Sequence, residues 1–268
     1  MKDNRRSFLS KAAMLGIAST VPFHMDAKPK SKPLPSLKGR KVLFVYGGWD
    51  GHQPLEYRDY MGEWIKSEGA EVTLSDSLDS YLDVELMRSV DLIVQIYTMS
   101  QITNEQEKGL VDAVKAGVGI AGWHGGLCDA FRNNVEYQFM TGGQWVAHPG
   151  GIIDYNVKIL KTGDEVTTGL KDFSMKSEQY YMHVDPNVKV LATTKFDGHV
   201  NEWINGCVIP VAWKKSYGKG RVFYTSLGHN LDHLTSVPAA LEMLQRGIKW
   251  ASAGKYEATE KLVNPIYG

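Results

Sequence analysis

Three histidines in glycine-rich loops are the residues best placed for chemistry in this sequence. His52 follows the first predicted strand, His124 ends a middle strand, and His229 follows the last strand. Ligands of open α/β sheets bind at the carboxyl ends of the strands, and glycines there let the backbone approach a ligand closely. Neutral imidazole suits a borderline divalent ion such as zinc. We therefore predict that the three histidines share one site, as ligands of a metal or as acid and base groups.

The remaining candidates are one carboxylate, further histidines and several aromatic side chains. Glu178 is the candidate carboxylate, and His124, Glu178 and His183 are the candidates for acid–base catalysis. The residues expected to bind a substrate are Trp49, Trp123, Trp145, His148 and Tyr181. Tryptophan rings beside the histidine motifs could stack on the faces of a sugar. His233 would join the site if the turn after His229 were helical.

Each of these residues also has an ordinary structural alternative. His52 could cap the following helix, and His124 could be a hydrogen-bonded core residue. His148, which precedes Pro149, could simply shape a turn. Glu178 could lie on the surface, and each tryptophan could be part of the core. These alternatives stay open at this point.

A cysteine nucleophile is a second reading of the same region. The turn at 123–126 occupies the place where amidotransferase-type α/β proteins carry a cysteine on a sharp elbow, but here the elbow residue is His124. Cys128 comes four residues later, and whether it pairs with Cys207 is open. The sequence has no G-x-S-x-G elbow, P-loop or G-x-G-x-x-G fingerprint. We therefore expect neither a serine hydrolase nor a nucleotide cofactor.

The first half of the chain alternates predicted strands with predicted helices. Strands are expected at 41–46, 70–74, 91–97 and 119–124. Helices are expected at 53–68 and 83–89, and a third between a capping box at Thr103 and Gln106 and a glycine at 117. This alternation predicts a doubly wound, mostly parallel sheet with helices on both faces.

The second half is less regular. Strands are expected near 152–160, 188–195, 208–213 and 221–226, and the last two are joined by a hairpin turn. A closing helix begins at Pro238 and runs to about Ser252. We expect one α/β domain over residues 40–252, followed by a C-terminal tail at 253–268.

The N-terminus has the pattern of a bacterial export signal. Arg5 and Arg6 precede Phe8, Leu9 and a short apolar run, which is typical of the twin-arginine route. We predict an export signal at 1–27, a Pro/Lys-rich linker at 28–39 with no means of packing, and a periplasmic or otherwise exported protein. The chain has 30 basic and 30 acidic residues, so its formal net charge is zero. Neither nucleic acid nor, after export, a membrane is therefore an expected partner.

Several motifs resemble those of the ThuA-like (trehalose utilisation) family. They are the Gly-x-x-x-His loop ending at His52 and the segments 122–126, 142–149, 177–181 and 218–229. The resemblance covers residues 40–252. It implies a class I glutamine amidotransferase-like, flavodoxin-like fold without the amidotransferase cysteine, and a role in sugar metabolism beside oxidoreductases that make 3-keto sugars. One departure is Ser177, where relatives often carry aspartate before the glutamate, which puts a ligand-binding role of that position in doubt.

The resulting expectation is an exported enzyme that cleaves or converts 3-keto-glycosides by metal- or histidine-assisted proton abstraction. Its partner would be a small carbohydrate and its cofactor a divalent metal such as zinc. The alternatives are a non-catalytic carbohydrate-binding or accessory protein on the same fold, and a cysteine hydrolase acting through Cys128. The sequence leaves the sugar, its linkage and the oligomeric state open.

Overall fold

A computed structural model describes residues 32–260 of the chain. The export signal predicted at 1–27 lies outside the described residues. Within the described part, no helix is both long and apolar enough to cross a membrane.

A nine-stranded sheet organises the protein, with the strand order β2-β1-β3-β4-β11-β10-β9-β6-β7. The first five strands in this order are parallel to one another: β2 (Glu71–Ser75), β1 (Lys41–Gly48), β3 (Leu92–Thr98), β4 (Gly119–Trp123) and β11 (Gly220–Thr225). β1, β3, β4 and β11 form short, mostly buried runs because they are covered on both faces, whereas the edge strand β2 is largely exposed. The predicted α/β fold is confirmed.

The other half of the sheet is antiparallel. It contains β10 (Val208–Tyr217), β9 (Lys189–Lys195), β6 (Ile152–Ile159) and β7 (Phe173–Glu178). The sheet is therefore mixed, with the parallel half as its helix-covered core. The strands predicted in the second half are confirmed as β6, β9, β10 and β11. β7 was not predicted; its polar and apolar residues alternate in F-S-M-K-S-E because one face is solvated.

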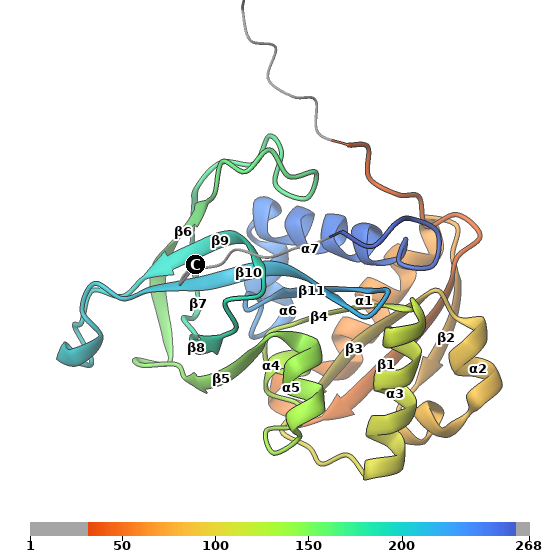
Figure 1. Ribbon diagram of the computed structural model, residues 1–268. Helices are drawn as coiled ribbons and strands as arrows, with labels where there is room; N and C mark the ends of the chain where they lie inside the picture. The colour runs from red at the N-terminus through yellow and green to blue at the C-terminus, as the bar shows by residue number, and fades with distance from the viewer. Residues whose placement is uncertain (1–31, 261–268) are drawn as a thin grey trace, which may run out of the picture. The chain divides into compact units, whose positions relative to one another are not determined.

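Helices cover both faces of the parallel half (Figure 1). On one face α1 (Pro54–Ser67), α6 (Leu231–Thr235) and α7 (Pro238–Ala251) pack against the sheet. On the other face lie η2 (Leu78–Leu82), α2 (Val84–Ser89), α3 (Asn104–Ala116), α4 (Gly125–Cys128) and α5 (Val135–Thr141). The capping box at Thr103 and Gln106 is confirmed at the start of α3, where both reciprocal hydrogen bonds form.

A small second sheet lies beside the carboxyl ends of the parallel strands. It pairs β5 (Gly143–Ala147) with β8 (Tyr181–Val184), and neither strand was predicted. Both strands are only four or five residues long, so their periodicity gives little signal. Two further 3-10 turns, η1 (Asp50–His52) and η3 (Glu202–Ile204), complete the described elements.

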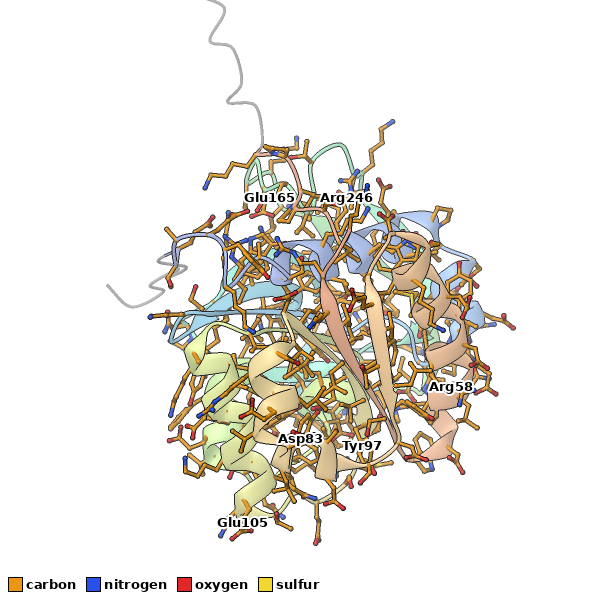
Figure 2. All side chains as sticks on the ribbon, turned by 90° about the vertical axis from the view of Figure 1, so that its right-hand side faces the viewer. Arg58, Asp83, Tyr97, Glu105, Glu165 and Arg246 are labelled. Atoms are coloured by element: carbon orange, nitrogen blue, oxygen red, sulfur yellow. The ribbon has the colours of Figure 1, made fainter. Side chains whose placement is uncertain are left out.

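Charged side chains anchor the long connection between β6 and β7. Lys214 of β10 is fully buried and pairs with Asp164 at 2.7 Å and with Glu165 at 2.8 Å. Arg246 of α7 donates to the carbonyl oxygens of Val166 and Thr168, and Figure 2 labels Arg246 and Glu165 near the top of the view. Because a buried charge needs a partner, these contacts fix the connection and serve the fold.

The segments flanking the predicted domain pack more closely than expected. The prediction that residues 28–39 lack any means of packing is wrong for Leu37, which is fully buried against the core of the α1 and α7 face. In the predicted tail, Tyr256 donates to Asp91 and stacks under Arg40. Arg221 also pairs with Glu257. The packed unit therefore extends on both sides of residues 40–252.

Candidate metal centre

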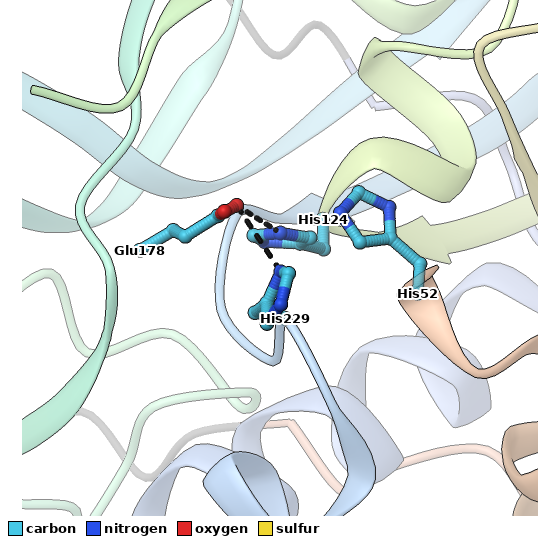
Figure 3. A group of neighbouring side chains, drawn as sticks. All are labelled: His52, His124, Glu178 and His229. Carbon is cyan, nitrogen blue, oxygen red and sulfur yellow. Dashed lines mark hydrogen bonds and ion pairs between the residues drawn. The ribbon is translucent and has the colours of Figure 1, made fainter. Parts of the chain in front are cut away.

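Four side chains from distant parts of the sequence converge where the strands end (Figure 3). His52 follows β1, His124 follows β4, His229 follows β11, and Glu178 ends β7. One donor atom from each lies within 4.8 Å of the donor atoms of the others. The carboxyl ends of β1, β4 and β11 lie at the same edge because these strands run parallel. The three histidines named from the sequence thus lie together, with the candidate carboxylate among them.

The turn that carries His124 is strained and tightly packed. His124 has φ 50° and ψ −140°, a conformation that non-glycine residues rarely adopt. A Cβ on Gly125 would lie 2.6 Å from the His52 ring, and one on Gly126 would lie 2.6 Å from the backbone of Ile96. Glycine is therefore required after His124, and its absence of a side chain lets α4 begin against the sheet.

Backbone strain in the described residues gathers around this cluster. The three non-glycine residues with positive φ are Gln53, Met99 and His124. They lie in the loops after β1, β3 and β4, which surround the cluster. Strained residues persist where the surrounding structure holds them, and they concentrate at functional sites.

The hydrogen bonds of His124 define which of its nitrogens faces the cluster. Nδ1 donates to the carbonyl oxygen of Ser226 at 2.8 Å, since a carbonyl can only accept. Neutral His124 therefore has its lone pair on Nε2, which lies 3.0 Å from Oε2 of Glu178. A lone pair and a carboxylate oxygen repel each other at this distance. A proton or a metal cation between them removes that conflict.

His229 and His52 complete the ring of donors. Nδ1 of His229 lies 3.3 Å from the same Oε2 of Glu178, and it has no well-aligned hydrogen bond among the described residues. Nδ1 of His52 pairs with the hydroxyl of Thr98 at 2.9 Å, which leaves Nε2 of His52 available. Metal-bound histidines usually hold their second ring nitrogen in this way. A set of three imidazoles and one carboxylate fits a zinc-type ion.

The electrostatics of the cluster favour the forms that bind a metal. Burial, followed by the neighbouring His124 and His229, lowers the pKa of His52 to about 2. Burial also lowers the pKa of His124, although Glu178 opposes this effect. Burial acts to raise the pKa of Glu178, but the neighbouring His124 and His229 outweigh it and hold that pKa below its usual value. The lowered pKa values of His52 and His124 favour neutral imidazole, and that of Glu178 favours the ionised carboxylate, which are the forms that bind a metal.

Three of the predicted substrate-binding residues lie next to the cluster. Trp49 is 46% exposed, and its ring lies 4.8 Å from that of His52. His148 has a side chain that is 40% exposed, with Nε2 3.7 Å from Oε1 of Glu178. Trp145 lies beside His148, with 5.7 Å between the ring centres, and Arg132 stacks on its ring. These side chains are positioned to contact a molecule that reaches the cluster.

Other predicted site residues lie elsewhere. Trp123 is fully buried and packs against Phe44 and Tyr57, so the expectation that it stacks on a sugar is wrong. The pleat of β4 turns Trp123 towards α1 and α7, away from the cluster. His183 is exposed on β8 and pairs in register with Gln144 of β5, outside the group of donors. Its proposed catalytic role therefore has no geometric support.

Tyr181 also points away from the cluster, while its neighbour faces it. Tyr181 packs against Phe196 at 5.6 Å, whereas Tyr180 stacks on His124 at 4.1 Å. Tyr180 was not among the predicted site residues, and neither were Thr98 and Ser226, which hold the Nδ1 atoms of His52 and His124. Tyr180 is two residues after Glu178, so alternation counted from Glu178 is the signal that could have found it, although β7 itself ends at Glu178.

The cysteine alternative has no support in the structure. Cys128 is buried, and burial raises the pKa of its thiol well above the ordinary value, which disfavours the reactive thiolate. Cys128 and Cys207 are both free, so they do not pair with each other.

Comparison with known proteins identifies the family. Residues 41–251 match the family model described as "Trehalose utilisation", ThuA. The chain belongs to the ThuA family. A comparison with curated proteins found no match.

Solved structures of ThuA-like proteins share the fold. A putative ThuA-like protein from Bacteroides uniformis is 17% identical, with a TM-score of 0.67 over 80% of this chain and 92% of that one. Another, from Parabacteroides merdae, is 20% identical, with a TM-score of 0.65 over 84% and 93%. A β-galactosidase from Rahnella sp. R3 is 14% identical, with a TM-score of 0.52 over 83% of this chain but 32% of that one. These likenesses show the fold alone.

Proposed function

We propose that this ThuA protein is an exported enzyme that cleaves 3-keto-glycosides at a divalent metal centre. The observation that carries the proposal is the contact of His124 Nε2 with Glu178 Oε2 at 3.0 Å. The carbonyl of Ser226 holds the proton of His124 on Nδ1, so two electron-rich atoms face each other in a buried place. A cation there would be held by His52, His124, His229 and Glu178.

The reaction that suits these residues starts from the acidity of a ketone. A carbonyl at C3 of a sugar acidifies the proton at C2, so a base can remove that proton while negative charge develops on the C3 oxygen. A bound divalent cation supplies Lewis-acid stabilisation of such charge. The C3 carbonyl then re-forms, a double bond forms between C1 and C2, and the C1 oxygen leaves with the electrons of the broken bond and takes up a proton. The glycosidic bond therefore breaks without the paired-carboxylate geometry of ordinary glycosidases.

His148 is the residue that we assign to proton transfer. Histidine is the commonest acid–base group in enzymes, and the His148 side chain is accessible beside Glu178. His52 and His124 are buried, with Nδ1 already engaged by Thr98 and Ser226. Glu178 fits holding a cation better than accepting a proton, because its lowered pKa makes it a weak base. We therefore assign Glu178 and His124 as metal ligands and not as acid–base catalysts.

The sugar would lie against the accessible aromatic side chains. Trp49 and Trp145 flank the cluster and offer rings on which the apolar face of a sugar can pack. The twin arginine at Arg5 and Arg6 supports the exported location. Membership of the trehalose utilisation family supports a carbohydrate substrate.

The test combines elemental analysis of the purified protein with a turnover assay on 3-keto-glycosides, using the parent glycosides as controls. We expect about one divalent ion per chain and release of the aglycone only from the 3-keto forms. Tight binding of the sugar without release would instead identify a non-catalytic carbohydrate-binding protein. A protein with neither metal nor turnover would refute the proposal.

A further inference from the structure

A second set of polar contacts joins the strand of Glu178 to the loop of His229. Ser177 precedes Glu178 on β7, and its side chain is fully buried. Its hydroxyl oxygen lies 3.2 Å from Nδ1 of His233 on α6. The same oxygen accepts the backbone N–H of His229 at 3.4 Å. One hydroxyl on β7 therefore contacts two other parts of the chain near the metal centre, α6 and the loop of His229.

The direction of these hydrogen bonds follows from Asn230. Its Oδ1 accepts the backbone N–H of His233 at 2.9 Å, which fixes the orientation of the amide. Its Nδ2 then lies 3.4 Å from Nε2 of His233 and can only donate. Neutral His233 therefore carries its proton on Nδ1 and donates it to Ser177. The chain of donors runs from Asn230 through His233 to the Ser177 hydroxyl.

This arrangement controls the position of two donors of the cluster. Ser177 is bonded directly to Glu178 in the chain, and its hydroxyl receives the backbone N–H of His229. The separation of 3.3 Å between Glu178 and His229 therefore depends on where that hydroxyl is held. Ser177 is fully buried, so a substrate that enters from solvent does not reach it. Its contacts with His233 and His229 indicate that it holds the metal ligands in position.

We propose that Ser177 and His233 are positioning residues of the metal centre, acting together to hold Glu178 and His229 at ligand distance. The inference rests on the metal-binding part of the proposed function and is independent of the sugar reaction. Partners that orient metal ligands commonly change metal affinity by 10–100-fold when they are removed.

The experiment measures metal binding by the full chain without any substrate. Zn²⁺ affinity is obtained by chelator competition, and the visible spectrum of the Co²⁺-loaded protein reports ligand geometry. The variants are Ser177→Ala, His233→Leu, their double mutant, and His233→Asn, whose amide can still donate to Ser177. Ser174→Ala is the matched control, because Ser174 lies on the same strand but is exposed and bonds to Asn156. Thermal unfolding of each metal-free variant checks the fold.

Ser177→Ala and His233→Leu should each weaken Zn²⁺ binding 10- to 100-fold and alter the Co²⁺ spectrum. The double mutant should be no weaker than either single mutant, since both remove one link. His233→Asn and Ser174→Ala should bind like the wild type. Unchanged affinity in both single mutants, or equal loss in Ser174→Ala, would overturn the inference even if sugar turnover were established. A wild-type chain that binds neither ion would overturn it as well, whereas a chain that binds metal without sugar turnover would contradict only the proposed reaction.

Discussion

Nδ1 of His124 donates to the carbonyl of Ser226 at 2.8 Å, while Nε2 of the same ring lies 3.0 Å from Oε2 of Glu178. The backbone of one loop therefore decides which nitrogen of His124 is free to bind a cation. The strained turn at His124 and the two glycines after it hold the ring in this place.

Replacing any one of His52, His124 or His229 with alanine should weaken metal binding 10-fold or more. Each side chain offers one donor atom to the group, and three donors cannot hold the ion as firmly as four. Zn²⁺ affinity measured by chelator competition checks this expectation. His183→Ala is the control, because His183 lies outside the group. Equal loss in the control would count against the assignment.

The metal-free protein should lose stability as the pH falls below about 6.5. The folded state holds the pKa of His52 at about 2, against 6.5 in the unfolded chain, so the unfolded state binds more protons between these values. The contribution of His52 to the free energy of unfolding is fully present above pH 6.5. Below that pH it falls by about 1.4 kcal/mol per pH unit. The lowered pKa of Glu178 acts in the same direction below its usual value.

Thermal unfolding between pH 5 and pH 8 measures this dependence. His52→Asn should flatten the curve, because it removes the group that the folded state keeps unprotonated. A metal-free protein equally stable at pH 5 and pH 7.5 would show that burial does not control the protonation of His52.

His148→Gln should lower kcat on a 3-keto-glycoside by about 10²–10⁴-fold, which is the usual contribution of acid–base catalysis. Metal content should stay at the wild-type value, because His148 is not in the donor group. His183→Gln should keep full activity. If His148→Gln retains wild-type kcat, the proton is transferred by another residue.

Replacing Trp123 should affect the stability of the fold, whereas replacing Trp49 should affect substrate binding. Trp123→Ala should destabilise the fold by about 3–5 kcal/mol, because a fully buried indole leaves a cavity beside Phe44 and Tyr57. Trp49→Ala should leave the unfolding temperature nearly unchanged and raise KM, since its ring is half-exposed beside His52. Denaturant unfolding and steady-state kinetics of both variants provide the measurement. The reverse pattern would place Trp123 at the substrate.

Replacing Arg5 and Arg6 with lysine should keep the protein in the cytoplasm. The twin-arginine route requires the arginine pair, which lysine replaces in charge but not in recognition. Fractionation of cells that express either form checks the outcome. Normal export of the lysine variant would argue against this route.

The sequence by itself determined the parallel strands and the position of three histidines at their carboxyl ends. The parallel strands show as short apolar runs, and the histidines follow these runs directly, so the end of the sheet at which they lie could be predicted. The glycines around His124 indicate that the backbone there lies close to another group. These features are local, and a local pattern is enough to predict them.

The tertiary structure decided what no local pattern contains. Because side chains alternate along β4, Trp123 lies in the core whereas His124 lies in the cluster. His183 lies outside the cluster, on the small sheet that pairs β5 with β8. Tyr180, Thr98, Ser226 and the Ser177–His233 pair reach the cluster only because distant segments meet there. Their side chains are common residue types in unremarkable sequence positions. Their roles depend on side-chain direction and long-range packing, which sequence spacing does not specify.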